Sequence, residues 1–225
     1  MFNIILMILS MLICFSALII VERIFKRDGM IVWVAVASVL ANILVCKTIN
    51  IAGFASALGN VMFASNFLAT DILTEKYDAK DGKKAVILGL VAVIGFVLTT
   101  QIALLFTPDS SDTAQDSMKT LFNFSLRTSI ASVTMYFVSN MLNIYIFEKL
   151  KEKIPGKLWF KSGFSTIISN CSENYLFAFG AFLGILDIPT ILSIATLGTV
   201  IEIIVGIFQT PFIYLAKGEK KGGVE

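Results

Sequence analysis

Two acidic side chains, Glu173 and Glu202, lie in the middle of apolar runs that are long enough to cross a lipid bilayer. A carboxylate at bilayer depth costs about 2.5–3.5 kcal/mol or more, so such groups usually face a helix-bundle interior or a water-filled cavity. Each acid can accept hydrogen bonds from a solute or carry a proton. The two positions therefore predict a polar internal site for a solute or an ion.

Both acids belong to helical faces that are rich in polar groups. Seven of the ten side chains in residues 165–174 can form hydrogen bonds, and Ser169 and Asn170 share a face with Glu173. The last apolar run carries polar or small residues at i, i+3, i+7 and i+10, namely Thr199, Glu202, Gly206 and Gln209. Such faces either line a cavity or form interhelical hydrogen bonds worth ~0.6–2 kcal/mol each. The high density of polar side chains on these two faces favours a cavity over interhelical hydrogen bonds alone.

Two earlier runs add further candidates. Arg127 lies near one end of its run, where its side chain could instead reach the membrane surface. Asp71 lies near the end of another run, where an ion pair with a basic loop residue is the alternative. The complete set of candidate solute-binding residues is Glu173, Asn170, Asn140, Asn143, Glu202, Asn66, Asp71, Arg127, Gln209 and Ser169.

Membrane-spanning helices must position these side chains. The chain has 225 residues, 56% of them apolar, and a mean hydropathy of +0.84. It contains seven apolar runs that are long enough to span a membrane, at about 3–21, 30–50, 54–74, 85–106, 121–147, 162–186 and 189–216. Membrane strands would instead alternate apolar and polar residues. We therefore expect an all-α integral membrane protein in which residues 1–225 form a single transmembrane domain.

The composition excludes several other classes of protein. The chain has no histidine, and its three cysteines lie within apolar runs, so neither a metal site nor a disulfide framework is expected. It has no phosphate-binding loop and no hydrolase motif, so we expect neither an enzyme nor a cofactor. Because no basic stripe is interleaved with aromatic residues, nucleic acid is not an expected partner. The expected partners are a small solute and the lipid membrane.

Basic residues indicate how the chain is oriented. Of the 18 Lys and Arg residues, 15 fall in alternate loops, which follow the first, third, fifth and seventh apolar runs. The loop at 107–120 is acidic instead. The positive-inside rule then places the N-terminus outside and the C-terminus in the cytoplasm. We expect a multi-pass protein of the cell membrane.

One segment resembles a known family signature. Phe67-Leu-Ala-Thr-Asp71-Ile-Leu-Thr-Glu75-Lys-Tyr77 is similar to the FLATD-x-x-x-E-x-[YF] motif of the queuosine precursor transporter family. Shorter similarities follow in the same order over nearly the whole chain, among them Lys47-Thr48 and Thr210-Pro211-Phe212. The resemblance implies an importer of 7-deazaguanine bases, such as 7-cyano-7-deazaguanine, 7-aminomethyl-7-deazaguanine or queuine, which are salvaged for tRNA modification.

The same resemblance implies an architecture. It is a compact bundle of six core helices plus one N-terminal helix, similar to the solute-binding membrane subunits of energy-coupling-factor importers. Members of the family resemble those subunits without having a dedicated ATPase partner, so none is expected here.

The chain departs from the family pattern at positions expected to touch solute. The family's Ser-Gln-x-x-Asp is here Ser139-Asn140-Met-Leu-Asn143 in one run and Ser169-Asn170-Cys-Ser-Glu173 in the next. Glu202 and Gln209 stand where the family tends to have a lysine and an aspartate. A carboxylate at position 173 could still accept N1–H and the exocyclic amine of a guanine-like ring as a bidentate pair. Glu202 could pair with a cationic substituent or with a coupling proton.

Several alternatives stay open at this point. The solute could be another purine-like or vitamin-like molecule. The chain could be a ligand-binding membrane subunit that needs an ATPase, or a membrane scaffold without a ligand. Gly180 and Gly184 have the spacing of dimerising helices, so a homodimer is open, with packing inside one chain as the alternative.

The charge asymmetry leads to a topological prediction. A tag placed in loop 107–120 should react with an impermeant reagent added outside intact cells, because this loop is acidic. A tag placed after Lys217 should react only after the membrane is permeabilised. The reverse pattern would contradict the predicted orientation.

Overall fold

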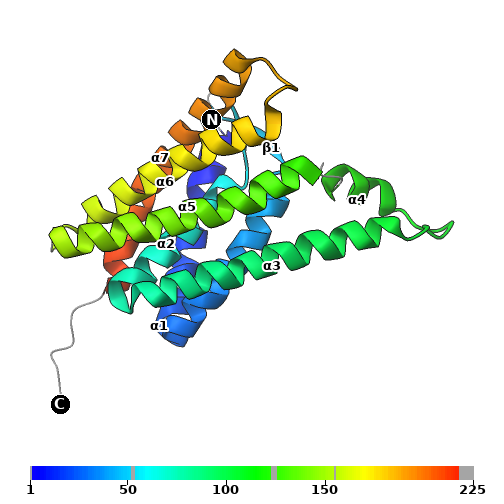
Figure 1. Cartoon of the computed structure of the whole chain (residues 1–225). Helices are drawn as coiled ribbons and strands as arrows, with labels where there is room; N and C mark the ends of the chain where they lie inside the picture. The colour runs from blue at the N-terminus through cyan, green and yellow to red at the C-terminus, as the bar shows by residue number, and fades with distance from the viewer. Residues whose placement is uncertain (1, 52–53, 123–125, 155, 218–225) are drawn as a thin grey trace.

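The computed structural model describes residues 2–51, 54–122, 126–154 and 156–217 (Figure 1). Within these residues the chain forms seven α-helices and one two-stranded antiparallel hairpin. The elements in chain order are α1 (Phe2–Leu44), β1 (Thr48–Ile51), β2 (Phe54–Ala57), α2 (Asn60–Lys76), α3 (Ala79–Leu105), α4 (Gln115–Phe122), α5 (Leu126–Lys153), α6 (Leu158–Phe182) and α7 (Ile188–Lys217). Apart from the hairpin, the predicted all-α architecture is confirmed.

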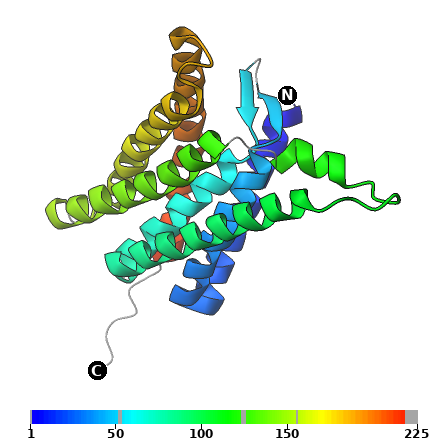
Figure 2. The ribbon, with the colours of Figure 1, turned by 45° about the vertical axis from the view of Figure 1, so that its right-hand side comes forward.

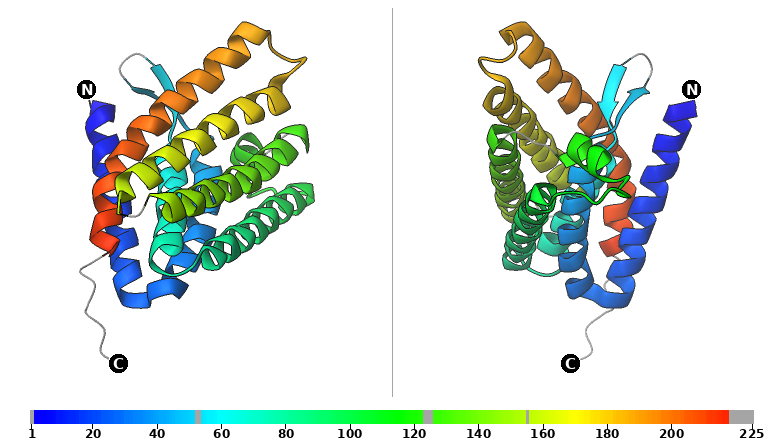
Figure 3. Two further views of the ribbon diagram at one scale, coloured as in Figure 1. Left: turned by 60° about the vertical axis from the view of Figure 1, so that its left-hand side comes forward. Right: turned by 90° about the vertical axis from the view of Figure 1, so that its right-hand side faces the viewer.

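The first two predicted spans form one element, α1, which reverses direction in its middle (Figure 3). Lys26 has a φ of 55° and a ψ of −134°, outside the helical region. Few non-glycine residues have a positive φ. Gly29 keeps this turn tight, because a Cβ at that position would lie only 2.7 Å from the Phe25 Cβ.

Strands β1 and β2 form a hairpin, which corrects the predicted ends of two spans. β1 and β2 pair along their full length, beginning with Thr48 opposite Ala57. The helix of the second predicted span therefore ends at Leu44, and the helix of the third begins only at Asn60. The β-branched residues of β1 favour a strand. Apolar character alone does not distinguish a short strand from a helix end.

Contacts between distant residues define two ends of the bundle. At one end, Asn3 Nδ2 donates to the Asn50 carbonyl at 2.8 Å, so the start of α1 lies against the hairpin. At the other end, Lys76 Nζ lies 2.6 Å from Glu22 Oε1 and donates to the Ala216 carbonyl at 3.0 Å. Figure 2 shows the hairpin near the top of the view and the end of α7 toward the bottom. We call these the hairpin end and the lysine end.

Further lysines gather at the lysine end. Lys151 Nζ donates to two carbonyls in the last turn of α2, at 2.6 and 2.9 Å, and Lys161 Nζ pairs with Glu75 Oε2 at 2.9 Å. Burial and a hydrogen bond to the Glu22 carboxylate raise the pKa of Tyr77, whose hydroxyl donates that bond at 2.9 Å. Residues in or next to all four lysine- and arginine-rich loops therefore lie at one end of the bundle. This agrees with the distribution of basic residues in alternate loops.

The outside of the bundle is apolar. Ile13, Val91 and Ile207 are 61%, 61% and 65% exposed, a pattern that suits lipid rather than water. Among the described residues, the helices that are long and apolar enough to span a membrane lie in Phe2–Leu44, Ala79–Leu105, Ile130–Lys153 and Ile188–Ala216. The chain is therefore a multi-pass membrane protein. Because α2 has only 17 residues and α6 is rich in polar groups, seven membrane crossings stay a prediction.

One close contact in the core can be tested directly. A Cβ at Gly89 on α3 would lie 2.1 Å from the hydroxyl oxygen of the buried Tyr136 on α5. We expect Gly89→Ala to destabilise the protein by about 1–3 kcal/mol, as overpacking does, and to lower the melting temperature in detergent. Gly95→Ala is the matched control, since a Cβ there meets nothing within 4 Å.

A second substitution tests the cause of that effect. Tyr136→Phe in the Gly89→Ala background removes the clashing oxygen and should recover part of the lost stability. An unchanged melting temperature in Gly89→Ala would contradict the proposed packing.

Candidate functional site

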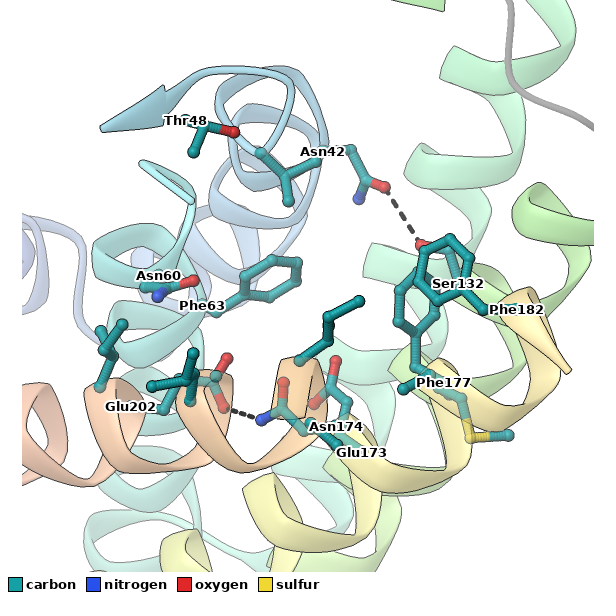
Figure 4. A pocket seen from close by; sticks show the side chains of 18 of the residues that line it. Asn42, Thr48, Asn60, Phe63, Ser132, Glu173, Asn174, Phe177, Phe182 and Glu202 are labelled. Carbon is teal, nitrogen blue, oxygen red and sulfur yellow. Dashed lines mark hydrogen bonds between the residues drawn. The ribbon is translucent and has the colours of Figure 1, made fainter. Parts of the chain in front are cut away.

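A cavity of about 540 Å³ lies between the helices in the half of the bundle nearer the hairpin (Figure 4). Seven elements contribute to it: α1, β1, α2, α3, α5, α6 and α7. Its polar lining residues are Asn42, Thr48, Asn60, Ser132, Glu173, Asn174 and Glu202. The rest of the lining is apolar, including the rings of Phe63, Phe177 and Phe182. Both the size and the lining are typical of small-molecule sites, which enclose ~300–1,000 Å³.

Glu173 and Glu202 reach this cavity from the neighbouring helices α6 and α7 (Figure 4). Asn174 Nδ2 donates to Glu202 Oε2 at 2.6 Å. Gly198 makes room for the amide, because a Cβ there would lie 2.6 Å from Asn174 Oδ1. One wall of the cavity thus carries two carboxylates, which accept hydrogen bonds from donors.

The facing wall carries neutral polar groups that are not among the ten predicted site residues. Ser132 Oγ donates to Asn42 Oδ1 at 3.4 Å, and Asn42 Nδ2 donates to the Ser38 carbonyl at 2.8 Å. Asn60 joins the cavity at the start of α2, directly after the hairpin. Asn42, Asn60 and Ser132 lie in stretches that resemble the family, but they were not predicted as site residues, because they carry no charge and the hairpin was not foreseen. Asn174 was recognisable, since it lies next to Glu173.

A buried polar layer lies beyond the cavity, toward the lysine end. Asn66 Nδ2 donates to Ser38 Oγ at 3.1 Å, and Ser38 Oγ lies 3.0 Å from the Tyr136 hydroxyl oxygen. Asn140 Nδ2 donates to the Tyr136 carbonyl at 2.8 Å. These contacts join α1, α2 and α5 through hydrogen bonds and keep the polar groups away from lipid.

Asp71 belongs to another cluster, still nearer the lysine end. Asn143 Nδ2 donates to Asp71 Oδ1 at 2.8 Å, and Ser162 Oγ donates to Asp71 Oδ2 at 2.5 Å. Gln209 Nε2 lies 3.5 Å from Ser162 Oγ and 3.4 Å from Thr166 Oγ1. All five residues are buried. Asp71 therefore accepts hydrogen bonds from two neutral donors, while an ion pair with a basic loop residue stays a prediction.

Several buried oxygens in these layers have no hydrogen-bond partner. Within the described part of the chain they are Asn66 Oδ1, Asn140 Oδ1, Asn143 Oδ1, Ser169 Oγ, Asn170 Oδ1 and Gln209 Oε1. An unpaired buried polar group costs ~1–3 kcal/mol. Every one of these atoms can accept a hydrogen bond, so the polar layers beyond the cavity hold several unpaired acceptors.

The structure separates the ten predicted site residues into groups. Glu173 and Glu202 line the cavity. Seven others lie in the polar layers beyond it, namely Asn66, Asp71, Asn140, Asn143, Ser169, Asn170 and Gln209. The side chain of Arg127 lies outside the described residues. Solute contact by any of the ten stays a prediction.

The long helices have an apolar exterior and enclose a cavity of ligand size. These features together define a membrane protein that binds or transports a small solute. Sequence comparison assigns the family. The family described as "Putative vitamin uptake transporter" matches residues 57–216, and the chain belongs to this family. It is therefore a transporter and not an enzyme, as predicted.

Two relatives carry the same description, "Probable queuosine precursor transporter". The relative from Bacillus subtilis (strain 168) is 35% identical over 195 residues, which cover 86% of this chain and 85% of the relative. The relative from Haemophilus influenzae is 27% identical over 130 residues, which cover 57% of this chain and 53% of the relative. No solved structure matches the chain. The resemblance to the queuosine precursor transporter family is thus confirmed.

The position of Asp71 leads to a test of its role. Asp71→Ala leaves the Asn143 and Ser162 donors without an acceptor, which should cost ~1–3 kcal/mol of stability. We expect a lower melting temperature in detergent but less than a threefold change in ligand affinity, because Asp71 does not line the cavity. Asp112→Ala, in an exposed loop, is the control. A tenfold or larger loss of affinity would instead place Asp71 in contact with solute.

Proposed function

We propose that this protein imports queuosine precursors, the 7-deazaguanine bases that cells salvage for tRNA modification. The solute class includes 7-cyano-7-deazaguanine, 7-aminomethyl-7-deazaguanine and queuine. The observation that carries the proposal is the Glu173 carboxylate on the wall of an apolar cavity of ligand size. The descriptions of the two relatives support the same class of solute.

The chemistry of the cavity matches a guanine-like base. The two oxygens of Glu173 can accept N1–H and the exocyclic amine as a bidentate pair, which is both strong and selective. The rings of Phe63, Phe177 and Phe182 offer flat apolar surfaces to a planar solute. The Asn42 amide on the facing wall can donate to the ring carbonyl oxygen.

The proposed setting is the cell membrane, with residues 1–225 as a single transmembrane domain of seven helices. The hairpin end faces outside and the lysine end faces the cytoplasm, in accord with the positive-inside rule. The cavity then lies in the outer half of the bundle, where an imported solute arrives. We expect the arrangement of one N-terminal and six core helices to be similar to the solute-binding subunits of energy-coupling-factor importers, here without an ATPase partner.

The Gly180 and Gly184 spacing gives little support to a homodimer. A Cβ at Gly180 would lie 3.5 Å from the Ala131 Cβ, so α6 already packs against α5 at this position. Gly184 lies beyond the end of α6 and has a φ of 82°. These contacts favour packing and a turn inside one chain, and a homodimer stays a prediction.

Complementation in cells tests the function. The chain is expressed in cells that cannot make deazaguanines and lack their own importer, and each base is supplied separately. Queuosine should then appear in tRNA for at least one base. Rescue only in the presence of an added ATPase would favour a partner-driven subunit. Failure with every base would favour import of another purine-like or vitamin-like solute.

Glu173→Gln tests the proposed recognition of the base. The change replaces one acceptor oxygen with a donor, which would face a donor of the ligand. The loss should be about 2–4 kcal/mol, or roughly 30- to 1000-fold in affinity for a deazaguanine bound to purified protein. Glu173→Asp should cost less, because it keeps the carboxylate. Glu152→Gln, at an exposed ion pair with Lys149, is the matched control. Equal affinity in Glu173→Gln and the original protein would remove Glu173 from the site.

A further inference from the structure

We infer that Asp71 and the side chains around it form a binding site for a small alkali-metal cation such as sodium, separate from the solute cavity. The site joins four helices, α2, α5, α6 and α7, which supply in that order Asp71, Asn143, Ser162 and Gln209. Each of these side chains is at most 1% exposed, and none of them lines the cavity. The inference does not depend on the identity of the transported solute.

Asp71 is a buried carboxylate, and no ion pair of the described residues includes it. Lys161 on α6 directs its ammonium to Glu75 Oε2 at 2.9 Å and lies 5.6 Å from the centroid of the Phe147 ring. Lys151 donates to carbonyls in the last turn of α2, where its charge offsets the negative end of that helix. Buried charges in proteins are paired or coordinate metal ions, so one further positive charge fits beside Asp71.

Both oxygens of Asp71 accept hydrogen bonds, as those of an ionised carboxylate do. Oδ1 accepts from Asn143 Nδ2 at 2.8 Å, and Oδ2 accepts from Ser162 Oγ at 2.5 Å. A protonated carboxyl group would instead donate from one of its oxygens. The two donors are neutral and leave the charge itself without a counter-ion. A carboxylate has about four acceptor positions, so positions remain for a cation.

Two amides beside Asp71 supply further oxygens of the kind that coordinate hard cations. Asn143 and Gln209 each turn the nitrogen toward the cluster and leave the oxygen without a partner. Because the nitrogen and oxygen of an amide lie about 2.2 Å apart, Asn143 Oδ1 lies at most about 5 Å from Asp71 Oδ1. Gln209 Nε2 lies 3.5 Å from Ser162 Oγ and 3.4 Å from Thr166 Oγ1, which are long distances for hydrogen bonds. Half a turn of either amide presents its oxygen to a cation.

The composition of the cluster favours a monovalent cation. Carboxylate, hydroxyl and amide oxygens are hard ligands, which suit hard cations rather than zinc or copper. The single carboxylate of Asp71 balances a single positive charge, and the hydroxyl and amide oxygens complete the coordination without adding charge. Within the described ranges, no group of three or more His, Cys, Asp or Glu side chains is placed to hold a metal ion.

Thermal unfolding of the purified protein in detergent tests the inference. Sodium chloride is compared with N-methyl-D-glucamine chloride at the same ionic strength, so that screening of surface charges is equal. Sodium should raise the melting temperature saturably, by roughly 3–6 °C at a concentration ten times its Kd. Radioactive sodium should bind saturably to the same protein. Equal melting temperatures in the two salts, without saturable sodium binding, would overturn the inference.

Variants locate the cation. Asp71→Asn removes the charge with little change of shape and should abolish the sodium-dependent rise in melting temperature. Asp112→Asn, the same change in an exposed loop, is the matched control and should keep it. Gln209→Met removes one proposed ligand and leaves both hydrogen bonds of Asp71 in place, so it remains informative if Asp71→Asn fails to fold. It should weaken sodium binding by roughly tenfold or more, and unchanged sodium binding in both Asp71→Asn and Gln209→Met would contradict the site.

Glu202→Gln separates this site from the two acids of the cavity. The sodium-dependent rise should persist in this variant, because Glu202 contacts Asn174 and lines the cavity rather than the Asp71 cluster. Loss of the rise in Glu202→Gln together with its retention in Asp71→Asn would place the cation in the cavity and overturn the inference. Import of a deazaguanine is tested independently, by complementation, so either result leaves the proposed function to its own experiment.

Discussion

Hydrocarbon solvates a carboxylate very poorly, and the arrangement of α6 and α7 depends on that constraint. Each of these helices places an acid at the depth where lipid would surround it, so both must turn the acidic face toward the other helices. Asn174 bridges the two helices at this level, and Gly198 has no side chain because the amide occupies that space. The cavity thus forms where two polar faces meet and cannot close on each other without bringing two acids together.

The distribution of polar and apolar residues in this bundle is the reverse of that in a water-soluble protein. Its outside is apolar, and its centre holds layers of amides and hydroxyls from the cavity to Asp71. In lipid the hydrophobic effect does not drive helices together, so packing and interhelical hydrogen bonds hold them. The hydrogen bonds of Asp71 and the layer around Tyr136 supply part of that cohesion, while Glu173 and Glu202 line the open space. Binding and cohesion are therefore distributed over different polar residues of the same helices.

Much of the fold and of the cavity lining could be predicted from the sequence, because a lipid environment imposes simple requirements on the sequence of a spanning helix. Apolar run length indicated the helices, and the cost of a buried acid singled out Glu173 and Glu202, which do line the cavity. The hairpin was missed because the composition of short segments such as β1 and β2 does not distinguish a strand from a helix end. Asn42 and Asn60 were not predicted as site residues, because the role of a neutral residue depends on the neighbours that other helices bring to it. Helical spacing identified inward faces correctly, but not which residue on a face meets a neighbour and which meets open space.

The contacts of Lys76 have a consequence for how the protein is made. Its ammonium joins Glu22, 54 residues earlier in the chain, to the carbonyl of Ala216, 140 residues later. The lysine end cannot be completed until the ribosome has finished α7, the helix that also carries Glu202. Through most of synthesis the membrane therefore holds an incomplete bundle whose polar faces have no final partner. Helix α7 supplies both the closing contact at the lysine end and the second acid of the cavity.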